Sequence, residues 1–439
     1  MRYQLKLKLP GLFLFAGTLL HIPVALALFE PGVGVGLQYT DNAGLTANNE
    51  NDDLIALGYV GASLDQKSGP LDFRGTTSLT YENYTDNTFD DQYYFDLNAT
   101  AGWEMIRDRL NVRLRDFFTQ RLSNTIDRST PNNIEDVNIF NVSPDLTVPV
   151  SKVQKLVINP EFSDFYFERS DIDNQQYSLS IDWLYDTSAV NQVGFGGVIS
   201  KTDFEDEDNN PNFLAKNIHA IVSGRLARTK YKLNLGFTKF DRDKLEDRSA
   251  PTGSLDWALG LGGRSEASVY LASDLTDHSF TALDSAITPE HGDINNVQIS
   301  SDVFRNNILR AVLLRKGATL KSKLWVELRD LDYKETPQDQ EVLNLGFKFN
   351  YQMRRLVSSG LFGGYKRTER TEQNRTDKQY VVGGEIGYQI SRELYALFKL
   401  QYQNKDSTDS VQEFSEFNGL VNLVYGYGEV ARKKRSGSF

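Results

Sequence analysis

The sequence predicts an all-β protein, a transmembrane antiparallel up-and-down β-barrel of about 18–20 strands. Three observations support this fold class. Apolar and polar residues alternate with a period of two along most of the chain. The alternating segments are longer than the ~5–6 residues of an average soluble strand and close to the ~9–11 residues of a tilted membrane strand. The connections between them are short and long in turn, as in bacterial outer-membrane barrels.

The composition excludes several other classes of protein. The 439 residues are 40% hydrophobic with a mean hydropathy of −0.44, too polar for a helical membrane protein. Aromatic residues make up 12%, which argues against disorder because so much aromatic surface has to be buried. The net charge of −11 argues against sequence-independent binding of nucleic acid, which needs a basic surface.

Few residues are suited to metal binding or catalysis. The chain has no cysteine, which excludes disulfides, thiolate metal sites and cysteine nucleophiles. Of its four histidines, His21 lies in the N-terminal segment, and His219, His278 and His291 are widely separated in sequence. We therefore expect that the protein is not an enzyme and that it binds no cofactor.

Residues 1–27 have the features of a secretory signal peptide. Three basic residues precede an apolar stretch, and Ala25-Leu26-Ala27 is a small-residue cleavage signal at its end. The alternative is an uncleaved membrane anchor, which Pro10, Pro23 and the short apolar core disfavour. After Leu28 no apolar run approaches the ~20 residues that a membrane helix needs.

The segment 93–104 illustrates the strand pattern that repeats through residues 28–428. Its odd positions are largely apolar, from Tyr93 and Phe95 to Trp103, and its even positions are mostly polar. Since successive strand residues point to opposite faces, one face of each strand is apolar and the other polar. In the segments where the alternation is most regular, the apolar face carries no Arg or Lys, and one Arg on a lipid-facing surface costs about 2–4 kcal/mol at mid-depth. Soluble sandwiches and propellers also alternate, but with shorter strands and less consistent loop asymmetry.

The connections set the strand number and the orientation. Taking Val303–Arg315 as one strand gives twenty strands with both chain ends on the short-turn side, and doubt about this segment sets the range of 18–20. The predicted long connections fall near 40–53, 85–91, 119–136, 168–174, 204–214, 241–251, 276–301, 332–341, 367–378 and 404–414. Bases are frequent in the short turns and acids in the long loops. Trp103, Trp183 and Trp257 each precede a short turn, which suggests an interfacial aromatic girdle rather than three unrelated core positions.

The first predicted strand, Gly34-Val35-Gly36-Leu37-Gln38-Tyr39-Thr40-Asp41-Asn42, resembles the opening strand of the β-barrel porin 2 superfamily. That superfamily includes EpsL-like outer-membrane proteins found with exopolysaccharide biosynthesis systems. Basic-Leu pairs just after the short turns, as at Arg109-Leu110, and the segment Asn141-Val142-Ser143-Pro144 are also similar to that family. The resemblance implies passage of a polysaccharide through the outer membrane.

Polar residues on the inward faces are the candidate site of a channel. The candidate lumen-lining residues are Arg74, Tyr94, Asp96, Arg113, Arg115, Asp182, Lys348 and Lys399. Two interpretations of these charges stand side by side. Either the charges select among solutes, or they only neutralise one another inside the barrel. The acidic loop Asp203–Asn210 carries oxygen ligands suited to Ca²⁺, although it lacks the glycine and terminal glutamate of an EF-hand, which favours a solvated loop.

The sequence therefore predicts a signal peptide at 1–27, an outer-membrane barrel at 28–428 and a basic periplasmic tail at 429–439. The leading functional hypothesis is a conduit for exopolysaccharide export or assembly. A general or solute-specific diffusion porin and a non-conducting structural barrel are the alternatives. The expected partners are outer-membrane lipid and, for the conduit, polysaccharide and periplasmic export or synthesis proteins.

Overall fold

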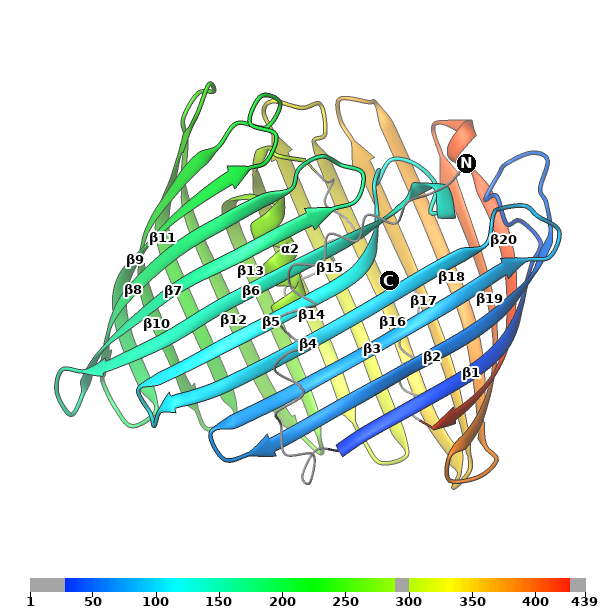
Figure 1. Cartoon of the computed structure of the whole chain (residues 1–439), viewed down its shortest axis with the longest axis horizontal. Helices are drawn as coiled ribbons and strands as arrows, with labels where there is room; N and C mark the ends of the chain where they lie inside the picture. The colour runs from blue at the N-terminus through cyan, green and yellow to red at the C-terminus, as the bar shows by residue number, and fades with distance from the viewer. Residues whose placement is uncertain (1–27, 289–299, 427–439) are drawn as a thin grey trace.

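The computed structural model describes residues 28–288 and 300–426 as a closed antiparallel β-barrel of 20 strands (Figure 1). This confirms the predicted fold class. Among the described residues, no helix is long and apolar enough to cross a membrane. Three predicted segments lie wholly or partly outside the described residues. They are the signal peptide at 1–27, the 276–301 loop (at residues 289–299) and the basic tail at 429–439.

Each strand is antiparallel to its neighbours in the chain, and most have 13 to 15 residues. The strands are β1 (Leu28–Thr40), β2 (Asp53–Ser68), β3 (Leu71–Tyr84), β4 (Gln92–Ile106), β5 (Leu110–Leu122), β6 (Ile134–Pro149), β7 (Gln154–Phe167), β8 (Asn174–Asp186), β9 (Asn191–Phe204), β10 (Phe213–Leu226), β11 (Thr229–Arg242), β12 (Arg248–Gly262), β13 (Ser265–Asp277), β14 (Val303–Lys316), β15 (Leu320–Tyr333), β16 (Gln340–Arg354), β17 (Val357–Arg370), β18 (Arg375–Gln389), β19 (Leu394–Ser407) and β20 (Phe414–Gly426). In the part of the chain that the structure describes, the helical elements are α2 (His278–Ile287), η2 (Pro131–Asn133) and η5 (Ser410–Gln412).

Pairing between the first and last strands closes the barrel. β1 and β20 run antiparallel, with Gly32 opposite Gly426 and Thr40 opposite Asn418. No sheet edge therefore remains among these strands, and each strand finds partners on both sides. The segment near 303–315 forms one strand, β14, which brings the count to the upper end of the predicted range of 18–20.

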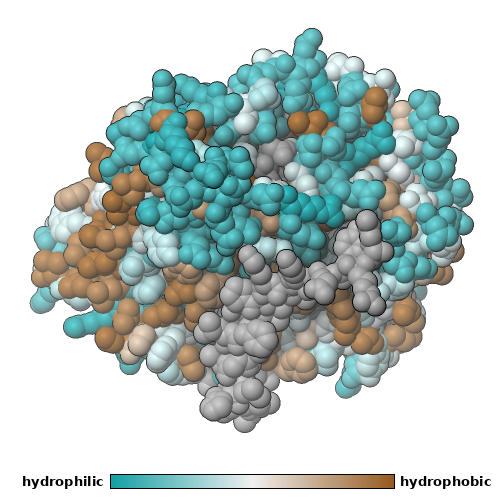
Figure 2. All heavy atoms as spheres, turned by 45° about the horizontal axis from the view of Figure 1, so that its top comes forward, coloured by the Kyte–Doolittle hydropathy of each residue, from teal (hydrophilic) through white to brown (hydrophobic). Residues whose placement is uncertain are grey.

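The outer surface carries a wide belt of exposed apolar side chains, which appears as brown patches below the hydrophilic long-loop end in Figure 2. Side chains on this belt alternate with inward residues as predicted. In β1, for example, Val33, Val35 and Leu37 are exposed, while Gly34 and Gly36 occupy the other face. An exposed apolar belt on a closed barrel is the surface that a lipid bilayer requires.

Aromatic side chains bound this belt at two depths. Near the short turns lie the outward aromatic residues Trp103, Trp183, Trp257, Tyr351, Tyr388 and Tyr425. Towards the long loops lie Tyr39, Tyr93, Tyr177, Phe237, Tyr380 and Tyr402. Tyr93 and Trp103 are about ten residues apart on one strand, which at ~3.3 Å per residue and the usual tilt is a depth of about 25 Å. That depth matches the apolar band of outer-membrane barrels and supports the predicted girdle.

Beyond the upper girdle the strands continue with polar residues on both faces. The outward side chains of Lys216 and Asp241 pair there at 2.5 Å, and Arg367 pairs with Glu369. The polar connection predicted at 367–378 is therefore mostly strand, since β17 and β18 leave only residues 371–374 between them. The predicted connection is longer than the observed one, because the alternation of apolar and polar residues disappears where both faces of a strand meet water.

We expect Val382→Arg to destabilise the barrel by about 2–4 kcal/mol, because Val382 lies on the outer face between Tyr380 and Tyr388. Urea titration of barrel folding into lipid vesicles measures this change in the free energy of unfolding. The matched control is Gln401→Arg on the inner face of β19, which should cost far less. Equal costs for the two variants would contradict the assigned faces.

Candidate functional site in the barrel lumen

The inner surface of the barrel has two walls that differ in charge. The acidic wall is the inner face of β1–β8, and the basic wall is the inner face of β11–β19. Inward acids of the acidic wall include Asp53, Asp65, Asp72, Glu82, Asp96, Glu104, Glu135, Asp145, Glu161 and Asp182. Inward bases of the basic wall include Lys232, Arg242, Arg248, Arg310, Lys321, Lys323, Arg329, Lys348, Lys366, Arg370, Arg375, Lys399 and Lys405. Each wall also carries a smaller number of opposite charges.

The eight candidate lumen-lining residues all lie on the face opposite the exposed apolar belt. Six are on the acidic wall and two, Lys348 and Lys399, are on the basic wall. Arg74 is 3.7 Å from Asp65, and Arg113 is 3.5 Å from Asp145, so these two bases have local acidic partners. That the eight residues line an open path stays a prediction.

Lys399 and Arg115 are held by neighbouring side chains. The Lys399 ammonium lies 4.9 Å from the centre of the Phe362 ring, which is a cation–π contact. Arg115 donates to the Asn141 amide oxygen at 2.8 Å. These contacts fix the two cations on the inner surface. They also show that aromatic and amide groups share the wall with the charges.

Asp182 forms a pair with His219 that the sequence does not reveal. The carboxylate Oδ1 is 2.9 Å from His219 Nε2, and His219 Nδ1 is 2.7 Å from Asn217 Oδ1. The register of β9 with its two neighbours brings the pair together, because Gly196 on β9 lies opposite both Asp182 on β8 and His219 on β10. A Cβ at Gly196 would collide with the Asp182 carboxylate, so the glycine leaves room for the pair.

The loop after β13 turns inward and forms helix α2 inside the barrel, where Figure 1 shows it behind the front strands. Asp277 caps this helix by accepting from the amides of Ser279 and Phe280. The Ser279 hydroxyl accepts from Asn174 Nδ2 at 2.8 Å, and the His278 ring lies 5.7 Å from that of Phe167. α2 therefore joins β13 to strands of the acidic wall.

An apolar cluster surrounds α2 within the barrel. Its members come from the long-loop ends of the strands, from the β7–β8 loop and from the helix: Phe117, Val137, Ile139, Phe165, Phe167, Ile172, Phe204, Phe213, Phe240, Ala250, Leu275, Ala282, Leu283, Val303, Phe304, Leu331 and Tyr333. Burying a Phe or Leu side chain contributes about 1.5–3 kcal/mol, so the cluster holds α2 in place. We did not predict it, because the sequence pattern assigns inward residues to water.

The β5–β6 loop, residues 123–133, crosses from the acidic wall to the basic wall. Arg370 donates to the Thr125 carbonyl at 3.1 Å, and Arg375 donates to the Ile126 carbonyl at 3.2 Å. Arg128 donates to the Val411 carbonyl at 2.7 Å and contacts that of Gly44. The loop is therefore fastened to β17, β18 and two other loops, and it spans the mouth of the barrel.

The arginines that hold this loop belong to a buried charge cluster. Asp377 accepts from Arg370 at 2.8 Å, from Arg375 at 2.7 Å and from the Ser407 hydroxyl at 2.6 Å, and Lys405 lies 3.6 Å away. The side chains of all four charged residues are at most 12% exposed. Three cations thus share one carboxylate. The cluster was not predicted, because the sequence pattern assigns residues 367–378 to a loop.

A second buried cluster on the basic wall has the same character. Glu327 lies 3.5 Å from Arg310 and 3.3 Å from Arg329, again with more cations than carboxylates. At the rim nearby, Glu335 pairs with Arg242 at 2.7 Å. Burial raises the pKa of Asp302, which lies in the connection before β14 and accepts from Thr336 at 2.5 Å.

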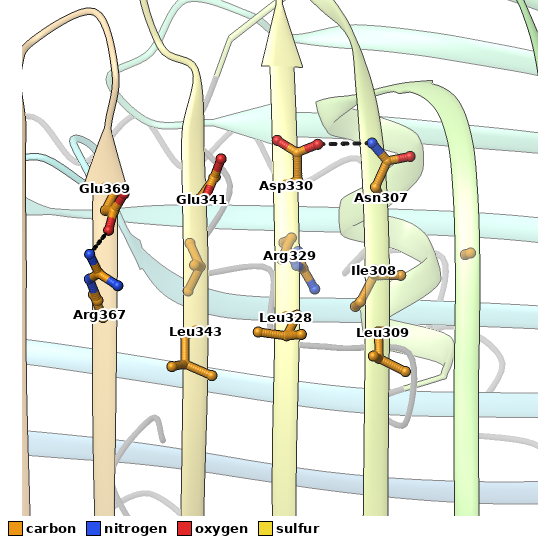
Figure 3. Close-up of a pocket in the computed structure, with 12 residues that line it drawn as sticks. Asn307, Ile308, Leu309, Leu328, Arg329, Asp330, Glu341, Leu343, Arg367 and Glu369 are labelled. Atoms are coloured by element: carbon orange, nitrogen blue, oxygen red, sulfur yellow. Dashed lines mark hydrogen bonds and ion pairs between the residues drawn. The ribbon is translucent and has the colours of Figure 1, made fainter.

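A hollow of about 500 Å³ lies across strands β14–β17, where the apolar belt meets the polar rim (Figure 3). Leu309, Leu328 and Leu343 form its lower part, while Asn307 and Asp330, joined at 3.0 Å, lie above them. It marks the boundary between lipid-facing and water-facing outer surface. It contains none of the predicted site residues.

Two of the acids in the loop of residues 203–210 contact other side chains of the protein. Asn209 donates to Asp206, and Lys244 lies 3.7 Å from Asp208, so these acids have partners within the protein. Within 28–288 and 300–426, no group of three or more His, Asp or Glu side chains is arranged to hold a metal ion.

We expect the triple variant Arg370→Gln, Arg375→Gln, Asp377→Asn to release the 123–133 loop, because it removes both guanidinium donors together with the carboxylate they neutralise. Hydrogen exchange of the loop amides should become at least about tenfold faster, equivalent to a loss of about 1.4 kcal/mol. Arg367→Gln, on the outer face of β17, is the control and should leave this exchange unchanged. Unaltered exchange in the triple variant would show that the arginines do not hold the loop.

Several solved structures of bacterial proteins are similar to this chain at low sequence identity. They include the FrpB iron transporter from Neisseria meningitidis (TM-score 0.47, 8% identity, covering 91% of this chain and 82% of that one) and the outer membrane protein opdK from Pseudomonas aeruginosa (TM-score 0.38, 8% identity, 91% and 99%). The copper transporter OprC matches with a TM-score of 0.46 and 9% identity, over 92% and 80%. No family model and no curated protein sequence matches the chain. The chain is thus a 20-stranded barrel whose resemblance to the β-barrel porin 2 superfamily stays a prediction.

Proposed function

We propose that this protein is an outer-membrane channel through which hydrophilic solutes diffuse passively. The observation that carries the proposal is the opposite polarity of the two faces of each strand: exposed apolar residues outside, and amide, hydroxyl and charged residues inside. A 20-stranded barrel is larger than the ~16–18 strands that leave an aqueous channel in porins. In this proposal the inward residues, from Arg74 to Lys399, line the path.

Localisation follows from the same proposal. Residues 1–27 serve as the signal peptide, residues 28–428 cross the outer membrane, and the basic tail at 429–439 lies in the periplasm. The two aromatic girdles support this placement, because interfacial Trp and Tyr are typical of both boundaries of a membrane barrel. Outer-membrane lipid is then the partner of the apolar belt. The channel carries out no chemical reaction and needs no cofactor.

A conduit for exopolysaccharide is the second candidate. It is favoured by inward amides near the β18–β19 pair, where Gln379, Gln401 and Gln403 can donate to and accept from sugar hydroxyls. The resemblance of the first strand to EpsL-like proteins points the same way. However, α2 and the 123–133 loop fill part of the lumen, which argues against the passage of a thick polymer. We therefore rank the conduit below the solute channel.

A non-conducting barrel is the third candidate, and the apolar cluster around α2 is the feature that favours it. That cluster involves β5–β7, β9–β15 and α2, and includes no residue of β1–β4 or β16–β20. Water access along this second group of strands is what the solute channel requires. Conductance separates the two candidates.

Planar bilayer recordings and vesicle swelling test the proposed function. Purified mature protein should produce discrete ion-conducting steps, and vesicles containing it should swell in small sugars. Addition of acidic exopolysaccharide should leave the conductance unchanged; a block at low polymer concentration would favour the conduit instead. Complete absence of conductance and swelling, from protein whose circular dichroism is that of a folded barrel, would support the non-conducting barrel.

A further inference from the structure

We propose that the lumen discriminates among solutes by a transverse electric field, and that zwitterions, which carry separated anionic and cationic groups, pass it best. The inference rests on the proposed function, since it names the class of solute that the channel favours. It is carried by the placement of the acidic and basic walls and by the two elements that bring them together.

The two walls face each other across the narrow dimension of the barrel. Figure 1 is viewed down the shortest axis of the molecule, with β2–β7 in front and β13–β18 behind them. The front strands belong to the acidic wall and the rear strands to the basic wall. A solute between them therefore has carboxylates on one side and ammonium or guanidinium groups on the other.

Screening by salt decides whether such a field reaches a solute. An unobstructed round barrel of this strand number would be roughly 40 Å across, from a strand spacing of ~4.8 Å and a tilt of ~40°. The Debye length at physiological ionic strength is only ~8 Å, so the centre of an open lumen would be screened. A transverse field therefore needs a narrower passage.

Two elements supply this narrowing. The 123–133 loop starts on the acidic wall, and Arg370 and Arg375 hold it on the basic wall. α2 starts from β13 and contacts Asn174 and Phe167 on the acidic wall. Both fill part of the space between the walls with protein, which polarises less than water. Charges that border the remaining passage are screened less than in an open lumen.

Local ion pairs leave the charge of each wall uncancelled. On the basic wall, Glu327 is shared by two arginines, and Asp377 by two arginines and a lysine. Lys348 and Lys323 lie directly opposite each other in register, a second sign that bases are in excess. On the acidic wall, the bases Arg74 and Arg113 are each within 4 Å of an aspartate, and the inward acids outnumber the inward bases.

The charge pattern affects solute classes differently. A neutral solute gains nothing from the field, and a singly charged solute is attracted by one wall but repelled by the other, so its gain is offset. A zwitterion aligns with its carboxylate toward the basic wall and its ammonium toward the acidic wall, so both ends gain. Surface potentials of several kT are ordinary in such clefts, enough to favour the aligned zwitterion by at least about twofold.

The test compares swelling rates of protein-containing vesicles in a zwitterionic dipeptide and in a neutral polyol of matched size. The wild-type protein should admit the dipeptide at least about twofold faster at low salt, and less selectively at high salt. Two double variants remove charge from opposite walls: Lys348→Gln with Lys399→Gln, and Asp96→Asn with Asp182→Asn. Each should bring the ratio of the two rates close to one.

The control is Lys378→Gln, which removes one cation from the exposed outer face of β18 and should leave the ratio unchanged. Each variant is first checked for barrel folding by circular dichroism. Equal rates for the dipeptide and the polyol in wild type, or an unchanged ratio in both double variants, would overturn the transverse field while leaving the channel intact. Absence of swelling in both solutes would overturn the proposed function and this inference with it.

Discussion

The requirement that every backbone amide and carbonyl be paired inside a lipid bilayer governs the rest of this structure. Hydrocarbon offers no hydrogen-bond partner, so a strand can cross only when both of its edges are paired. Pairing of β1 with β20 meets this condition by closing the sheet. Closure then fixes two environments, lipid outside and the lumen inside, and each strand alternates between them residue by residue. The two aromatic girdles lie where the outer environment changes from lipid to water.

The lumen meets a different constraint, because charges there lie close together and partly out of water. Removing one partner from a buried ion pair leaves an uncompensated charge, which costs about 3–5 kcal/mol. The Arg370–Asp377–Arg375 cluster satisfies its carboxylate several times over and uses the spare guanidinium groups to hold the 123–133 loop. The same residues thus stabilise the wall and hold a loop across the lumen. α2 is held by the opposite means, apolar burial.

Alternation in the sequence was sufficient to predict the barrel, its strand number to within two, and the faces on which residues such as Val33 and Lys348 lie. It failed where the two environments cease to differ. At the long-loop ends of β17 and β18 both faces are polar, so Arg370, Arg375 and Asp377 looked like loop residues. Around α2 the inner face is apolar, as at Ile139 and Phe165, and no pattern with a period of two can indicate that an internal helix covers it. The Asp182–His219 contact depends on register between β8, β9 and β10, which sequence alone does not specify.

The central claim is that one face of each strand meets lipid and the other meets water. The chain contains no cysteine, so single cysteines can be introduced at successive positions from Phe95 to Trp103 on β4 and spin-labelled without background. Accessibility to oxygen and to a water-soluble nickel chelate should then be measured in lipid bilayers. The account predicts that both vary with a period of two and in opposite phase, oxygen being highest at the odd positions. Uniform accessibility along the segment, or maxima of both reagents at the same positions, would contradict it.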